Sequence, residues 1–514
     1  MSDPKPKDWT IMIYLAGDNN LSEDMAGNIQ DIRPIIIGKT ESNASIIEQK
    51  YDNVAVLAYY DGGSPRTPTY YYDFTDGFDP APPVGETDSA DPRSIIDFVR
   101  WAKGKYRSKY NVLFLSGHSD GFQGISLLKD DTSHTSLKIA GLREGLEEVT
   151  NNLGQPLDIL CFDSCVMSMA EVAYEFRNVA DILIASQGFI PTSGLDYGGF
   201  LAKMISENFN ESPEKVSETI VKTFASSQLG YVLGGRSVTL SAVSLGSTED
   251  DGERTSYIFD LSKEIDGLAG LFLKYLSQNK VYYPEIFNKN SPLNFEEYEK
   301  LTEPNRYIFE ALKRILLFCQ WNSQSFMSDQ FIDLKDFCEL LIDECSSLAK
   351  NDFYDEAITK ILKQAKKVVK AFDNCIIVEA ENVGADYQFA KGLSVYFPWS
   401  YEGFSISRNA YKNLTFNLTF TNWMKFIETY VKEVSVRNSK LPLRTAQTLF
   451  EKNTFSRKLL LSGLRENKHG YDFKHGYDFK MDVLVKYFGK FKNLPLVDYE
   501  QILDEIRKQS IKNQ

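Results

Sequence analysis

The feature that most constrains the fold is a repeated unit in which a short, nearly continuous apolar run is followed by a turn and a helical pattern. Such runs occur at residues 10–16, 54–60, 112–115, 157–162 and 182–186. Strands that are apolar on both faces are typical of parallel sheets covered by helices on both sides. The chain is therefore predicted to have an α/β fold with a mostly parallel sheet. The Tyr-rich run at 70–74 is expected to form an antiparallel edge strand.

Two of these runs lead into residues with reactive side chains. One is followed by the sequence Ser-Gly-His at 116–118, and the other by Asp-Ser-Cys at 163–165. The carboxyl ends of parallel strands meet at one edge of the sheet, where open α/β sheets bind their ligands. A thiol close to an imidazole is the minimum needed for nucleophilic catalysis by cysteine. We therefore expect Cys165 to be a nucleophile with His118 beside it, in preference to a buried structural thiol and a loop cap.

The residues around Cys165 suggest how the thiol would be activated. A helical pattern at 167–176 follows the cysteine directly, and a thiol at a helix amino terminus is stabilised as a thiolate. Asp163 is expected to point toward the same crevice because side chains alternate along a strand. Three roles are open for this acid: the floor of a pocket for a basic substrate side chain, a partner that orients His118, or a helix N-cap.

Length and composition limit the classes of protein to which the chain can belong. A chain of 514 residues is expected to hold two or three domains, and its net charge of −14 argues against nucleic-acid binding. No apolar stretch is long enough to span a membrane, and the polar amino terminus does not resemble a signal segment. Six cysteines in a chain of this size suit a reducing compartment. Together these features predict a cytoplasmic protein without membrane or nucleic-acid partners.

The pattern changes after residue 246. Amphipathic helices are expected at 257–278 and 305–373, and strand-like runs at 376–380 and 392–398. The six-residue sequence His-Gly-Tyr-Asp-Phe-Lys at 469–474 is repeated at 475–480. A metal or partner loop is one interpretation of this repeat, but a tandem duplication in a surface segment is favoured. The metal ligands of the chain, if it has any, are unknown, and the acidic stretches at 18–20 and 130–131 match no calcium-ligand spacing.

Several separate stretches, taken in order, resemble the clostripain-like (C11) cysteine peptidases, which belong to the same broad clan as caspases and gingipains. Any one of these stretches is short, but their order along most of the chain makes the resemblance specific. They are residues 9–21, 116–118, 163–167, 185–197, 237–242, 330–337 and 392–398.

The resemblance implies a caspase-like fold with helices on both faces of the sheet and a helical carboxyl-terminal part. It divides the chain into a peptidase core at 1–245, a helical and strand continuation of that fold at 246–430, and an extension at 431–514. It also implies an endopeptidase that cleaves protein or peptide substrates after Arg or Lys. In this family the residue at His118 is the general base or acid and that at Cys165 the nucleophile. Asp163 would form an acidic S1 pocket, with Asp196 as its wall. The chemistry requires no cofactor, although some members depend on calcium.

Members of this family commonly mature by cleavage between the histidine and cysteine blocks, so the chain is expected to be a zymogen. Lys129, Lys138 and Arg143 are the candidate cleavage sites, and an activating protease or regulatory partner would control the step. The family usually has Gly directly after the histidine, where backbone amides build the oxyanion hole. Ser119 occupies this position, and its side chain adds bulk near the substrate. The alternative function is therefore an inactive peptidase-like scaffold that binds a partner through the same groove.

Overall fold

The computed structural model describes residues 6–37, 53–63, 67–75, 81–124, 126–206, 210–233, 236–248, 254–277, 295–327, 330–349, 355–384 and 386–434. The His-containing repeat at 469–480 lies outside the described residues, as does the predicted extension from residue 435 onward. Among the described helices, none combines the length and the apolar character needed to cross a bilayer.

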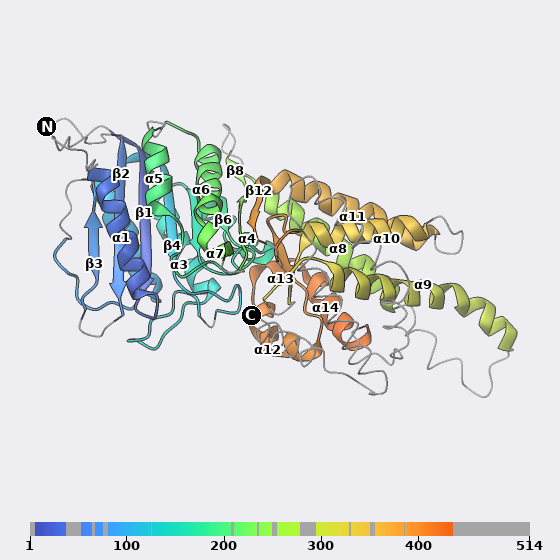
Figure 1. The fold of residues 1–514 in the computed structure, drawn as a ribbon. Helices are drawn as coiled ribbons and strands as arrows, with labels where there is room; N and C mark the ends of the chain where they lie inside the picture. Colours follow the sequence, from blue (N-terminus) through green and yellow to red (C-terminus); the bar gives the residue numbers. More distant parts are fainter. Residues whose placement is uncertain are drawn as a thin grey trace.

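An eight-stranded sheet forms the amino-terminal half of the molecule (Figure 1). Its five central strands are parallel and adjacent, in the order β6 (Ala180–Ala185), β5 (Leu157–Asp163), β4 (Ser108–Ser116), β1 (Lys7–Gly17) and β2 (Val54–Gly62). The expected antiparallel edge strand is β3 (Tyr70–Asp73), which pairs with β2. At the other edge, β7 (Val238–Ser244) and β12 (Ile376–Val383) are antiparallel to their neighbours. The predicted mostly parallel α/β sheet is thus confirmed.

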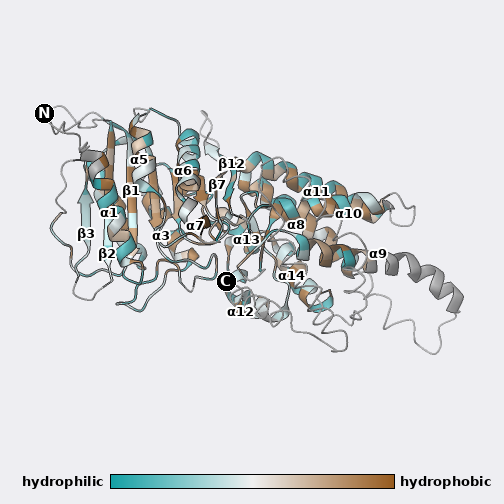
Figure 2. Cartoon of the chain, in the orientation of Figure 1, coloured by the Kyte–Doolittle hydropathy of each residue, from teal (hydrophilic) through white to brown (hydrophobic). Residues whose placement is uncertain are grey.

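Alternation along β1 separates two hydrophobic cores. Trp9, Ile11 and Ile13 face one core, while Met12 and Tyr14 face the other. The first core includes helices α1 (Ser22–Ile37), α5 (Tyr197–Ser206) and α6 (Pro213–Ser227). The second includes α2 (Pro92–Lys105), α3 (Ile139–Leu153) and α4 (Ala170–Glu175). Figure 2 shows apolar strands between helices whose outer faces are hydrophilic, as expected when burial of apolar surface holds the layers together.

The carboxyl-terminal part is mainly helical. It contains α8 (Tyr257–Ser277), α9 (Phe295–Asn322), α10 (Leu334–Leu348), α11 (Asp355–Cys375), α12 (Tyr401–Lys412), α13 (Thr415–Thr419) and α14 (Thr421–Glu433). The single helical run expected at 305–373 was wrong, because the chain forms three helices there. Between α9 and α10 it turns through the short strands β10 (Ser325–Phe326) and β11 (Phe331–Asp333), and Asp333 caps α10 by accepting a 2.8 Å hydrogen bond from Asp336 N. The remaining short elements are α7 (Leu229–Leu233), β8 (Ser247–Thr248) and β9 (Arg254–Thr255).

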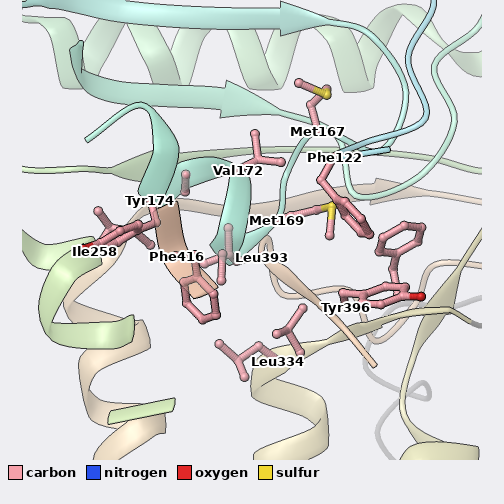
Figure 3. Close-up of a cluster of buried hydrophobic side chains, with 14 of the residues drawn as sticks. Phe122, Met167, Met169, Val172, Tyr174, Ile258, Leu334, Leu393, Tyr396 and Phe416 are labelled. Carbon is pink, nitrogen blue, oxygen red and sulfur yellow. The ribbon is translucent and has the colours of Figure 1, made fainter. Parts of the chain in front are cut away.

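A second, three-stranded sheet supports the segment that follows β5. Its strand β13 (Ser394–Tyr396) pairs with β11, and Ser394 N donates a 2.9 Å hydrogen bond to Ser168 O. Figure 3 shows Met167 and Met169 in one buried cluster with Tyr396 of β13 and with Leu393, which directly precedes that strand. The carboxyl-terminal part therefore contacts the loop after β5 directly. The domain boundaries at 245 and 430 stay predictions.

Candidate active site

The register of β4 and β5 places the chain positions of the two candidate reactive residues at the same edge of the sheet. Ser116 and Asp163 are partners in the parallel register of these strands. His118 and Cys165 each lie two residues beyond this pair. The pairing of the two chain segments continues just past the end of β4, because Gly117 N donates a hydrogen bond to Asp163 O at 3.2 Å. His118 and Cys165 thus leave adjacent strands at the same level.

Cys165 differs from the other cysteines in its exposure. All six lie in the described ranges; five are buried, and Cys165 alone is partly accessible. Its Sγ accepts a 3.4 Å hydrogen bond from Ile190 N. Burial raises the pKa of the Cys165 thiol, the Ile190 amide opposes this rise, and the charge of Asp163 adds to it. In this conformation the thiol is therefore protonated at neutral pH.

The expected helix directly after Cys165 was wrong. The helix α4 begins only at Ala170, and a turn with Val166 at a φ of 59° separates it from the strand. The intervening residues make other hydrogen bonds: Val166 N donates to Gly188 O, and Ser168 N donates to Ser186 O, both at 2.9 Å. These contacts hold the chain extended beside the next loop, so no helix amino terminus lies at the thiol.

The imidazole of His118 forms a hydrogen bond with a side chain of the turn after β1. Its Nε2 lies 2.8 Å from Oδ1 of Asn20. An amide oxygen only accepts hydrogen bonds, so Nε2 carries the proton and Nδ1 is left as the acceptor. Burial lowers the pKa of His118, the cation of Lys129 lowers it further, and Asp131 raises it. The imidazole is therefore neutral near pH 7, with Nδ1 ready to take a proton.

Asp163 ends β5 and is 3% exposed. Its Oδ2 accepts hydrogen bonds from Ser116 Oγ at 2.8 Å and from the Tyr197 hydroxyl at 2.9 Å. Its Oδ1 is buried and accepts no hydrogen bond of good geometry, although the nearby Leu195 amide also stabilises the charged carboxylate. Burial raises the pKa of this carboxyl. Of the three roles left open, helix capping is excluded because the N-cap of α4 is Met169, and the partner that orients His118 is Asn20.

The loop between β6 and α5 approaches this carboxylate closely. A Cβ added to Gly194 would lie 2.5 Å from Oδ2 of Asp163, and the φ of Gly194 is 69°. Only glycine fits both the left-handed backbone and this approach. Two residues later, Asp196 is half-buried, and its Oδ1 accepts a 2.7 Å hydrogen bond from Gly199 N in the first turn of α5. Asp196 thus stabilises a helix terminus next to the Asp163 carboxylate.

Ser119 has its hydroxyl engaged inside its own loop. Ser119 Oγ accepts a 3.1 Å hydrogen bond from Gly121 N and lies 2.8 Å from Sδ of Met167. The serine therefore bridges the loop after β4 and the segment after β5. Its hydroxyl stabilises the two loops that hold His118 and Cys165.

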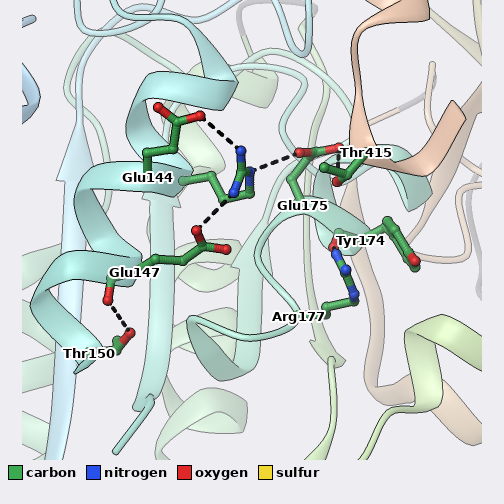
Figure 4. A network of polar contacts seen from close by, with 8 residues as sticks. Glu144, Glu147, Thr150, Tyr174, Glu175, Arg177 and Thr415 are labelled. Atoms are coloured by element: carbon green, nitrogen blue, oxygen red, sulfur yellow. Dashed lines mark hydrogen bonds and ion pairs between the residues drawn. The ribbon is translucent and has the colours of Figure 1, made fainter. Parts of the chain in front are cut away.

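The three candidate cleavage sites differ in their surroundings. Lys129 and Lys138 are exposed, and Lys138 precedes α3 directly. Arg143 lies inside α3, its side chain is 17% exposed, and its guanidinium pairs with Glu144, Glu147 and Glu175 (Figure 4). A peptidase binds its substrate as an extended chain, so the folded protein does not offer Arg143 for cleavage. The two lysines stay as candidates.

A buried polar network around the segment after β6 was not anticipated from the sequence. Gln187 Nε2 donates a 3.0 Å hydrogen bond to Oδ2 of Asp333, and Gly392 N donates to Gln187 Oε1 at 2.9 Å. Burial raises the pKa of Asp333 to about 7. The network attaches the loop that contacts Cys165 to the carboxyl-terminal part. No local sequence signal identifies such a partner 146 residues away.

Metal binding was examined in the same region. Within the described ranges, no three side chains of the types His, Cys, Asp or Glu are grouped as ligands for a metal ion. Calcium binding normally needs six to eight oxygen ligands, several of them carboxylates. We assign no chemical step to a metal. Calcium dependence stays a prediction.

Known proteins resemble this chain over much of its length. Residues 13–430 match the profile of the Clostripain family (Peptidase_C11). Clostripain from Hathewaya histolytica is 26% identical over 217 residues, a stretch that covers 37% of this chain and 40% of that protein. A secreted C11 cysteine protease from Bacteroides thetaiotaomicron, solved in complex with an irreversible peptide inhibitor, has a TM-score of 0.50 at 15% identity, with 80% of this chain and 98% of that chain covered. An inactive zymogen C11 protease from Parabacteroides distasonis has a TM-score of 0.47 at 18% identity, over 81% and 99% of the two chains.

Proposed function

The chain belongs to the clostripain family of cysteine peptidases, and we propose that it is an endopeptidase that cleaves proteins or peptides after Arg or Lys. Cys165 is its nucleophile and His118 its acid–base partner. The observation that supports this most directly is the register of β4 and β5, which places the imidazole and the thiol two residues beyond the pair Ser116–Asp163. The caspase-like fold of the family agrees with the mostly parallel sheet described above.

The chemistry follows from the proton positions. His118 Nδ1 takes the proton of the Cys165 thiol, and the thiolate attacks the carbonyl carbon of the scissile peptide bond. The imidazolium then gives its proton to the departing amine, which leaves an acyl group on Sγ. In the second half, His118 takes a proton from water, and the hydroxide formed releases the acyl group as a carboxylic acid. Backbone amides near Ser119 and Cys165 stabilise the oxyanion, and one such donor typically contributes about 3 kcal/mol.

Preference for a basic residue is explained by the unused oxygen of Asp163. A buried carboxylate oxygen without a partner is unfavourable, and a guanidinium or ammonium group would satisfy it. Because burial raises the pKa of Asp163 in the empty site, a bound cation would also favour its ionised form. Asp196, on the loop that approaches Asp163, forms the pocket wall. Similarity to clostripain supports the same assignment.

We also propose that the chain is made in a latent form. In the described conformation the thiol has a raised pKa and the imidazole a lowered one, so the thiolate–imidazolium pair is disfavoured. Lys129 lies in the segment between the histidine and cysteine blocks and contributes to the low pKa of His118. Cleavage after Lys129 or Lys138, by a second copy or by an activating protease, would release this segment. A regulatory partner would act on the same loop.

The rival hypothesis of an inactive scaffold rests on Ser119 and on the long carboxyl-terminal extension, which lies outside the described residues. The hydroxyl of Ser119 is engaged with Gly121 N, which weakens the case for a blocked site. A cytoplasmic location stays a prediction from the sequence, whereas the neighbour from Bacteroides thetaiotaomicron is described as secreted.

The proposal is tested with fluorogenic peptides that end in Arg, Lys or Asp, with and without calcium. Wild type is compared with Cys165→Ala and with the matched control Cys338→Ala, which removes a buried thiol. Each sample is examined on a gel for a cut between residues 129 and 143. Cleavage after Arg and Lys that disappears only in Cys165→Ala would support the peptidase and its specificity.

Two other outcomes are informative. An intact, inactive chain that gains activity after limited proteolysis would show a zymogen. A chain cut in this segment but still inactive, whose Cys165 does not react with iodoacetamide, would overturn the proposal in favour of the scaffold.

A further inference from the structure

We propose that Asn20 is the positioning residue of the active site, fixing the tautomer and the ring orientation of His118. The inference rests on the proposed function of His118 as the acid–base residue. Nothing in the histidine and cysteine blocks points to Asn20, because it lies 98 residues before His118 in the chain.

The sheet topology brings the three residues together. The strands β5, β4 and β1 are consecutive in the sheet, and Leu15 of β1 pairs with Ser116 of β4. The turns after these strands contain Cys165, His118 and Asn20 respectively. His118 therefore follows the middle strand of the three, with Cys165 after one neighbouring strand and Asn20 after the other. One ring nitrogen, Nε2, faces the Asn20 side.

The contact itself sets the chemistry of the ring. Asn20 Oδ1 accepts a hydrogen bond from His118 Nε2 at 2.8 Å, which fixes the proton on Nε2 and leaves Nδ1 for the thiol proton. When His118 becomes protonated, the same bond persists, because Nε2 carries a hydrogen in both forms. The amide thus supports both protonation states without adding a negative charge. The charged groups that affect the ring are Lys129 and Asp131, on the loop packed against this turn.

The turn that holds Asn20 is itself firmly anchored. Asn19 Nδ2 donates to Ala16 O at 3.0 Å and to Lys129 O at 2.8 Å, and Asn19 Oδ1 accepts from Leu21 N at 2.9 Å. These three bonds fix the backbone on both sides of Asn20. Preorganisation of this kind keeps a positioning group in place before the substrate arrives.

A second set of contacts connects the turn to its surroundings. Asp131 N donates to Asp18 O at 2.7 Å, and Gly63 N donates to Ser22 Oγ at 2.9 Å. Both Lys129 and Asp131 belong to the segment in which processing is proposed. The orientation of His118 is therefore connected through Asn20 to the loop that separates the histidine and cysteine blocks.

The test compares Asn20→Ala and Asn20→Asp with wild type and with Asn409→Ala, an exposed asparagine on α12. In processed enzyme, Asn20→Ala should lower kcat by about 100-fold with KM nearly unchanged, because ring misplacement affects the chemical step. Asn20→Asp should restore part of kcat. It should also move the ionisation of His118 in the pH profile upward, because a nearby carboxylate favours imidazolium.

A second measurement does not depend on turnover. Nitrogen-15 chemical shifts of His118 should show the Nε2–H tautomer in wild type and a mixture of tautomers in Asn20→Ala. An unchanged tautomer together with an unchanged pH profile would overturn the role of Asn20. If wild type cuts no peptide even when processed, the proposed function fails, and the tautomer measurement still decides whether Asn20 positions the ring.

Discussion

The hydroxyl of Ser116 donates a 2.8 Å hydrogen bond to Oδ2 of Asp163, its partner in the register of β4 and β5. The bond joins the ends of the two strands from which His118 and Cys165 emerge. It also occupies one oxygen of the carboxylate and leaves Oδ1 without a hydrogen bond of good geometry. A single contact thus joins the two strand ends that lead to the proposed dyad and orients the acid proposed to bind the substrate cation.

Replacement of this acid should change specificity more than folding. Asp163→Asn keeps the shape of the side chain but removes the charge, so kcat/KM for Arg and Lys peptides should fall by about 10- to 100-fold, the value of a hydrogen bond to a charged group. Cleavage of a peptide with a neutral residue at the same position should change little. Asp196→Asn serves as the comparison, and its kcat/KM for Arg and Lys peptides should fall less. Unchanged preference for Arg in Asp163→Asn would place the pocket acid elsewhere.

The reactivity of Cys165 should depend on processing. Since burial raises the pKa of the thiol, iodoacetamide should modify Cys165 slowly at pH 7 in the intact chain and faster as the pH rises above 9. After cleavage between residues 129 and 138 the rate at pH 7 should increase. Mass spectrometry of the modified peptide follows this directly. Rapid modification of the uncut chain at pH 7 would contradict a latent state.

Lys129 is expected to influence His118 before any cleavage occurs. Its cation lowers the pKa of the imidazole, so Lys129→Gln should raise this pKa. Lys138→Gln is the control, because Lys138 does not contribute to the lowered pKa of His118. Titration of carbon-13-labelled histidine by NMR measures both variants. If the titration midpoint of His118 is the same in Lys129→Gln as in wild type, the Lys129 cation does not influence the imidazole.

Glu171 gives the folded state a pH dependence. The residue is buried, its Oε1 accepts from Tyr396 N at 2.9 Å and from the Tyr411 hydroxyl at 2.7 Å, and burial raises its pKa to about 7. A carboxyl with a raised pKa in the folded state stabilises the fold fully below its unfolded pKa, and this contribution is lost as the pH rises through 7. Wild type should therefore become less stable between pH 5 and pH 8. In urea denaturation, Glu171→Gln should be less stable than wild type, and the difference in unfolding free energy should be smaller at pH 8 than at pH 5. An equal difference at both pH values would show that Glu171 is not the source of the pH dependence.

Arg143 is expected to be structural. Its Nε lies 3.4 Å from Oε2 of Glu175, which is 1% exposed and also accepts from the Thr415 hydroxyl (Figure 4). Arg143→Ala would leave Glu175 buried without its cation, at a cost of about 3 kcal/mol. The exposed Arg100, which pairs with Glu148, provides a control whose loss should cost less than about 1 kcal/mol. Equal stability of the two variants would show that the Glu175 contact contributes little.

Residues close in sequence account for what could be predicted. The apolar runs at 112–115 and 157–162 indicated parallel strands. Asp91-Pro92 is a typical helix start, and in α2 Asp91 Oδ1 accepts from Arg93 N at 2.9 Å. Reactive residues at the ends of the runs then placed His118 and Cys165 on one edge of the sheet. These features are readable because periodicity and capping act over a few residues.

Contacts between distant segments decided the rest. The chain after Cys165 stays extended because Gly188, Ser186 and Ser394 satisfy its backbone, so the helical pattern at 167–176 yields a helix only from Ala170. Likewise, Asn20 became the partner of His118 because β1 happens to neighbour β4 in the sheet. The sequence by itself determined the five parallel strands, the antiparallel edge strand at 70–73 and the proposal of His118 and Cys165 as the reactive pair. Only the tertiary structure decided which side chains orient that pair, because a hydrogen bond across 98 residues leaves no local pattern.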